Sequence, residues 1–193
     1  STRTLRDETA QRRLCQTLAI SRTTAVSSSF SRTMLGLAAE YAVASELCRR
    51  NLYAQLTLGH QKKTDILVFS EAGEVARIEV KAKQGSEWPN CKGIAGGNVF
   101  LVFVDYQRRT PEQRPDFFVL TVKEWRKVLE KRVAEQRARN PKVEITISAE
   151  NVAVFPGQIG KSGKPYEGMN IRPHDLYPFR ECWQTIERVV TNG

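Results

Sequence analysis

Asp65, Glu79 and Lys81 are the residues whose types and spacing best suit a chemical reaction. Asp65 precedes a short apolar run, and segment 77–83 alternates charged with apolar residues, so we expect two strands. The connection 71–74 has hairpin length and contains a glycine, which predicts that these strands pair. Two carboxylates and an ammonium would then meet, a combination that suits a hard divalent cation and a phosphate.

The order and spacing of Asp65 and Glu79-Val80-Lys81 resemble the motif of the PD-(D/E)XK nuclease superfamily, which includes many restriction enzymes and Holliday-junction resolvases. Thr64 stands where the family motif has a proline, a departure that short loops in the superfamily often show. The alternative interpretation is a solvated face of an amphipathic hairpin, on which Glu79 and Lys81 are only surface neighbours.

The likeness is strongest over residues 36–84 and includes a predicted helix that carries Glu40, where resolvase-like members also have a glutamate. The apolar and alanine-rich neighbours of Glu40 would desolvate its carboxylate unless it has a partner. Sequence does not fix the rotation of a helix, so Glu40 facing solvent is an equal alternative.

The resemblance implies an α/β domain with a restriction-endonuclease-like mixed β-sheet flanked by helices. It also implies an endonuclease that hydrolyses phosphodiester bonds in DNA and depends on Mg²⁺, with Mn²⁺ as an alternative to Mg²⁺. Asp65, Glu79 and the carbonyl of Val80 would bind the metal. Lys81 would orient or help deprotonate the attacking water and offset charge in the transition state. Glu40 would support these ligands or bind a second metal ion.

Further residues around the motif are candidates for contact with nucleic acid. Lys62 and Lys63 lie in a polar loop before Asp65 and could meet the phosphate backbone, with an ordinary solvated loop as the alternative. Lys83 and Gln84 end the motif strand, where both would reach substrate. Trp88 follows in an irregular segment and could stack on a base, although such a tryptophan more often plugs the edge of a core.

The composition fits a polyanion-binding globular protein. The 193 residues include 30 Lys and Arg against 21 Asp and Glu, which gives a formal net charge of +9. This balance indicates DNA as partner, with RNA left open, although membrane-surface and ribosome-adjacent proteins share it. No apolar run reaches the length of a bilayer span, so no membrane contact is expected. The four cysteines lie far apart, which favours a reducing intracellular location, cytoplasmic or DNA-associated.

The chain divides into residues 1–30, expected to be a flexible N-terminal arm or a cloning remnant, and a nuclease-like domain over 31–193. A helix is predicted over 31–51, with an inward stripe of Leu37, Tyr41, Ala44 and Cys48. Six strand regions are predicted, at 52–58, 66–69, 77–83, 99–104, 117–120 and within 143–155.

Two helices and one long loop complete the expected domain. Thr121 and Glu124 have capping-box form and should open a helix with a buried stripe over 125–133. Residues 156–173 are rich in Gly and Pro and are expected to form a loop. Pro178 is expected to open the last helix.

Two other functions remain compatible with the residues. One is a nucleic-acid-binding module on the same fold that does not cleave, and the other is a basic scaffold or interaction protein. A homodimer is also open, because many nucleases of this class act as dimers to cut two strands.

Overall fold

The computed structural model describes residues 31–57, 64–160 and 162–191. Its centre is a five-stranded sheet with the strand order β1-β2-β3-β5-β6. Strands β1 (Tyr53–Leu56), β2 (Ile66–Phe69) and β3 (Val75–Lys83) form an antiparallel meander. Strand β5 (Val99–Asp105) runs parallel to β3 and antiparallel to β6 (Asp116–Thr121). The sheet is therefore mixed, as predicted.

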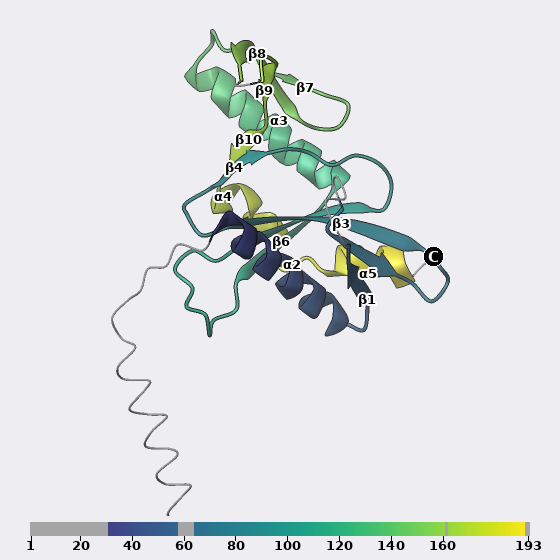
Figure 1. Cartoon of the computed structure of the whole chain (residues 1–193). Coiled ribbons are helices and arrows are strands. Elements are labelled where there is room, and N and C mark those ends of the chain that lie inside the picture. Colours follow the sequence, from purple (N-terminus) through teal and green to yellow (C-terminus); the bar gives the residue numbers. More distant parts are fainter. Residues whose placement is uncertain (1–30, 58–63, 161, 192–193) are drawn as a thin grey trace, which may run out of the picture. The chain divides into compact units, whose positions relative to one another are not determined.

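Helices α2 (Arg32–Cys48) and α5 (Gln184–Thr191) cover one face of this sheet (Figure 1). Every second residue of the strands points to this side, as the pleat requires. The buried side chains of this layer include Val43 and Leu47 from α2, Ile78 from β3, Val102 from β5 and Ile186 from α5. The packing on this side of the sheet is mainly apolar.

Helix α3 (Val122–Arg139) covers the opposite face together with β4 (Trp88–Cys91), β10 (Met169–Ile171) and the short α4 (Pro173–Leu176). The predicted capping box is present, because the Thr121 side chain accepts from the Glu124 N–H and the Glu124 carboxylate accepts from the Thr121 N–H. The predicted stripe is buried as well: Trp125, Val128, Leu129 and Val133. The α/β class and the mixed sheet flanked by helices are confirmed.

Beyond α3, a second sheet of three strands has the order β7-β8-β9, formed by β7 (Thr146–Ile147), β8 (Ala153–Ile159) and β9 (Pro165–Glu167). Strand β10 pairs antiparallel with β4, which brings residues 169–171 back to the segment that follows the motif. The region 156–173, predicted as one long loop, is thus largely strand. Backbone hydrogen bonds to β4 and β8 make these residues strands. The local Gly and Pro content does not reveal such long-range pairing.

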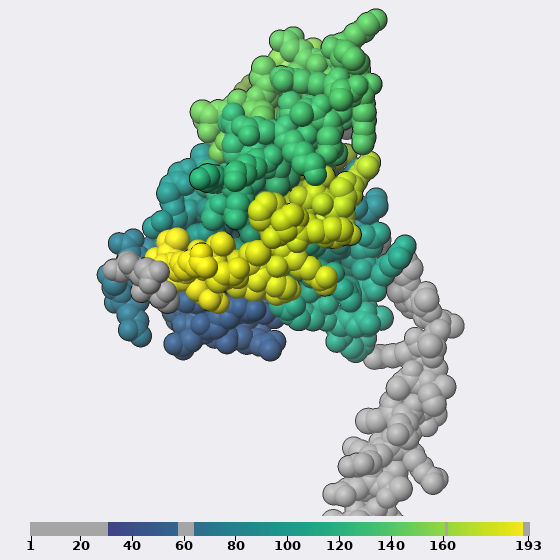
Figure 2. All heavy atoms as spheres, turned by 180° about the vertical axis from the view of Figure 1, so that it is seen from behind, coloured from purple at the N-terminus to yellow at the C-terminus, as the bar shows by residue number. Residues whose placement is uncertain are grey.

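The C-terminal helix also differs from the prediction. Pro173 opens α4, η1 (Tyr177–Phe179) contains Pro178, and α5 begins only at Gln184. From behind, the yellow C-terminal segment lies against the green region that contains α3 (Figure 2). No helix in the described residues is both long and apolar enough to cross a membrane.

Helix α2 is rotated relative to the predicted stripe. Leu37 and Tyr41 are 39% and 61% exposed, while Ala39, Val43 and Leu47 are fully buried. Small and apolar residues lie on several sides of this helix, so its periodicity supports more than one buried face. Packing on the sheet selects the face with the smaller side chains.

The buried Glu46 ties α2 to two distant segments. Its Oε1 accepts from Arg114 Nε at 2.9 Å, and its Oε2 accepts from Arg50 at 2.6 Å. Arg114 also makes a bidentate pair with Glu181 at 2.7 and 2.9 Å. The hydrogen bond from Arg114 is the main cause that lowers the pKa of Glu46 to about 2. The network joins α2, the loop before β6 and the C-terminal segment.

Candidate active site

Asp65 lies directly before β2 and is fixed to β3 at two points. Its backbone N–H donates to the carbonyl of Ile78 at 2.8 Å, and its Oδ2 accepts from the N–H of Val80 at 2.6 Å. These two bonds bracket Glu79, so Asp65 lies beside that residue across the hairpin. The hairpin therefore brings Asp65 and Glu79 together, as the motif predicts.

Glu79 and Lys81 share one face of β3. In the parallel register Glu79 lies beside Leu101 and Lys81 beside Phe103, and both neighbours belong to the core on the α3 side. The Lys81 ammonium makes an ion pair with Glu79 Oε1. The Lys81 side chain is 30% exposed, whereas the Glu79 residue is only 6% exposed. The Lys81 ammonium is therefore accessible to solvent, whereas the Glu79 carboxylate beside it is buried.

The second oxygen of Glu79, Oε2, is buried and has no hydrogen-bond partner. Buried polar atoms are nearly always paired, and leaving one unpaired costs about 1–3 kcal/mol, or more when it is charged. An oxygen of this kind is the donor that a hard divalent cation prefers. The Glu79 carboxylate therefore fits a metal ligand better than it fits a surface ion pair.

Glu40 lies on the half-buried side of α2. Burial raises the pKa of its carboxyl group, and the negative charge of Asp65 raises it further. Glu40 is therefore within electrostatic range of Asp65. Two neighbouring carboxylates repel each other, and a bound cation would relieve that repulsion.

The described residues contain no group of three or more His, Cys, Asp and Glu side chains arranged as a metal-binding cluster. Magnesium commonly takes only one or two protein carboxylates and keeps several waters, so Asp65 and Glu79 are a sufficient set. The backbone N–H of Val80 donates to the Asp65 carboxylate. A role for the backbone carbonyl of Val80 as a metal ligand stays a prediction.

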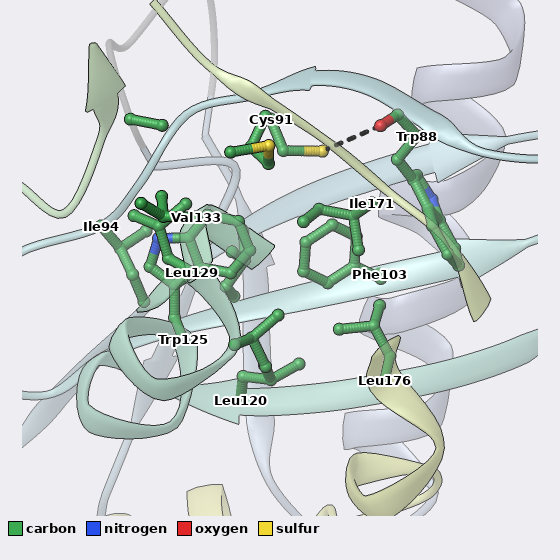
Figure 3. Close-up of a cluster of buried hydrophobic side chains, with 14 of the residues drawn as sticks. Trp88, Cys91, Ile94, Phe103, Leu120, Trp125, Leu129, Val133, Ile171 and Leu176 are labelled. Atoms are coloured by element: carbon green, nitrogen blue, oxygen red, sulfur yellow. Dashed lines mark hydrogen bonds between the residues drawn. The ribbon is translucent and has the colours of Figure 1, made fainter. Parts of the chain in front are cut away.

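Two of the predicted nucleic-acid contacts are wrong. Lys83 is 2% exposed, and its ammonium donates to Asp105 Oδ1 at 2.6 Å. Trp88 is 1% exposed, and its indole N–H donates to the carbonyl of Lys81 at 3.1 Å. Figure 3 shows the Trp88 ring near Phe103 within the apolar cluster. Strand β4 folds back over β3 and closes these side chains off from substrate.

The other predicted contacts have different outcomes. Gln84 is half-buried just after β3, and its contact with substrate stays a prediction. Lys62 and Lys63 lie outside the described residues, as does the arm 1–30.

Cys91 is within electrostatic range of Lys81 and Glu79, which no motif in the sequence indicates. Burial raises the pKa of its thiol to about 12, Lys81 opposes that effect, and Glu79 and Glu87 add to it. Its Sγ lies 3.5 Å from the carbonyl oxygen of Trp88 (Figure 3). A thiol with so high a pKa stays neutral at physiological pH, so Cys91 is not a candidate nucleophile.

Comparison with known proteins gives a weak structural likeness. No family model matches this sequence, and no curated protein matches it. A solved structure of a bacterial homing endonuclease, I-Ssp6803I, covers 83% of this chain and 94% of its own chain, with 14% identity and a TM-score of 0.44. A likeness at this level carries no argument about function, so the residues of the site must carry it.

Proposed function

We propose that this chain is a metal-dependent endonuclease of the PD-(D/E)XK type, a hydrolase of phosphodiester bonds in DNA. The observation that carries the proposal is the buried, unpaired Oε2 of Glu79, which lies beside the Lys81 ammonium and next to Asp65. A surface ion pair would leave both carboxylate oxygens open to water. A ligand oxygen facing inward has no partner until a cation binds.

Asp65 and Glu79 would hold Mg²⁺ or Mn²⁺, and Glu40, whose pKa the charge of Asp65 raises, would support them. When bound, such an ion polarises the phosphate and makes its coordinated water more acidic. The hydrogen bond from the Val80 N–H holds Oδ2 of Asp65 against β3. This bond pre-orients the carboxylate, because the backbone that donates it belongs to the same strand as Glu79.

Lys81 is the cation of the described site that faces solvent. Its pair with Glu79 Oε1 holds the ammonium beside the carboxylate that would bind the metal. From there it can orient the attacking water and stabilise negative charge that grows on the phosphate oxygens. The water oxygen bonds to phosphorus and its proton passes to solvent, while the bond to the leaving sugar oxygen breaks and that oxygen takes up a proton from solvent.

The formal net charge of +9 supports a polyanionic substrate. The test is incubation of the full chain with supercoiled plasmid, linear duplex, flap, junction and single-stranded DNA, and with RNA. Each substrate is run with Mg²⁺, with Mn²⁺ and with a chelator. The proposal expects metal-dependent cleavage of at least one DNA substrate. Binding without cleavage under every metal condition would favour the non-catalytic module instead.

A further inference from the structure

A polar cavity of about 350 Å³ lies between α3, the β8–β9 hairpin and β10. This volume is at the lower end of the range typical of ligand pockets. Its wall includes three arginines, Arg132, Arg139 and Arg172. It also includes three amide side chains, Gln136, Gln158 and Asn170, and two aromatic rings, Phe155 and Tyr166.

Some of the polar side chains in this wall have hydrogen-bond or ion-pair partners within the protein. The Arg132 guanidinium is buried, donates to Glu135 at 2.6 Å and lies 3.5 Å from Asp175. The Asn170 amide donates to Glu87 Oε1 at 2.8 Å, and Arg172 lies 3.5 Å from the other Glu87 oxygen. Carboxylates therefore already balance the charges of these two arginines.

Other polar side chains in the wall have no hydrogen-bond or ion-pair partner within the described residues. Among the described residues, the side chains of Gln136, Arg139 and Gln158 make no hydrogen bond or ion pair. Tyr166 packs edge-on against Phe155 with ring centroids 5.6 Å apart and is half-buried. The cavity thus offers one uncompensated guanidinium, two free amides and a pair of aromatic rings to a ligand.

This cavity is attached to the catalytic face. Glu87 belongs to its wall and directly precedes Trp88, whose indole holds the carbonyl of Lys81. Gly168, between β9 and β10, brings the hairpin against β4 so closely that a Cβ there would lie 2.9 Å from the Asn90 backbone. The cavity and the motif strand are therefore linked through β4 and not through a loose loop.

We infer that this cavity holds an unpaired nucleotide of the DNA strand that also crosses the motif, an inference that rests on the proposed function. Guanidinium groups bind phosphate, amide side chains hydrogen-bond to base edges, and aromatic rings stack on bases. A base in a continuous duplex cannot enter a concave cavity of this kind. The inferred substrate therefore has a single-stranded tail, a flap or an extruded nucleotide beside the cut site.

The test is equilibrium binding in chelator, read by fluorescence anisotropy, with a blunt duplex and with duplexes bearing a 5′ or a 3′ single-stranded tail. The parent should bind one tailed duplex at least about fivefold more tightly than the blunt duplex, which is the lower end of the effect of stacking one base. Arg139→Gln and Gln158→Ala should each bring that ratio close to one. Lys131→Gln is the matched control, because it removes an exposed charge from the same helix outside the cavity and should keep the preference.

Equal affinity of the parent for all three duplexes would overturn the inference, and so would cavity variants that keep the tail preference. The inference also fails if Lys131→Gln removes the preference as fully as Arg139→Gln does. Metal-dependent cleavage together with tail-independent binding would support the nuclease proposal and overturn only the inference about the cavity. Absence of any DNA binding by the parent would overturn both.

Discussion

Replacing Glu79 by glutamine in chelator separates a metal site from a surface ion pair. In the parent, the unpaired Oε2 costs about 1–3 kcal/mol. The pair of Oε1 with the partly exposed Lys81 returns only about 0–1 kcal/mol. Glu79→Gln keeps the shape and removes the charge. We expect a variant that is between equally stable and about 2 kcal/mol more stable than the parent without metal.

Metal should stabilise the parent more than it stabilises Glu79→Gln. A ligand at ten times its dissociation constant stabilises the native state by about 1.4 kcal/mol. For a chain of this length that corresponds to a rise in Tm of about 3–6 °C. The parent should show this rise in millimolar Mg²⁺, and Glu79→Gln should show little of it. Thermal melts in chelator and in Mg²⁺ measure both quantities.

Glu74→Gln supplies the control, because Glu74 is an exposed carboxylate in the turn of the same hairpin. Its metal response should equal that of the parent. A Glu79→Gln variant that is less stable than the parent in chelator and gains as much from Mg²⁺ would refute the reasoning. That result is what a surface pair of Glu79 and Lys81 would give.

Two further predictions concern the buried Glu46 and the DNA path. The lowered pKa of Glu46 is a stabilisation that is fully present above its ordinary value of 4.5 and is lost as the pH falls through about 2. Arg114→Ala should cost about 1–2 kcal/mol at pH 7, after allowance for the partly exposed arginine, and less at pH 3. Urea unfolding at both pH values measures the difference, and an equal loss at each would contradict it. If Lys62 and Lys63 both contact phosphates, removing the two should flatten the slope of log affinity against log salt by about one to two. An unchanged slope would exclude that loop from the DNA path.

The sequence predicts the motif hairpin well because its signals are local. Strict alternation on β3, the apolar run of β2 and the turn at Gly73 each act within a few residues, and the structure has all three. The capping box at Thr121 is equally local and is also present. The pairing of the hairpin then brings Asp65 to Glu79 without any long-range information.

The predictions from sequence are wrong where contacts with distant segments determine the environment of a residue. Lys83 looks free along its own strand, but its partner Asp105 is 22 residues away, on a strand that the sequence does not show to be parallel. Trp88 is in the core because β4 pairs with β10, some 80 residues later. The rotation of α2 likewise depends on the sheet beneath it, and the exposed Tyr41 gives no local warning.

The most direct test of the proposed site is cleavage of a DNA substrate by matched variants of the purified full chain. Initial rates in Mg²⁺ are compared for the parent, Asp65→Asn, Glu79→Gln, Lys81→Met and the control Glu74→Gln, each confirmed as folded by its melt. The site predicts metal-dependent cleavage by the parent and by Glu74→Gln, and a loss of at least about 100-fold in each of the other three. Cleavage at the parental rate by any two of those three variants would contradict it.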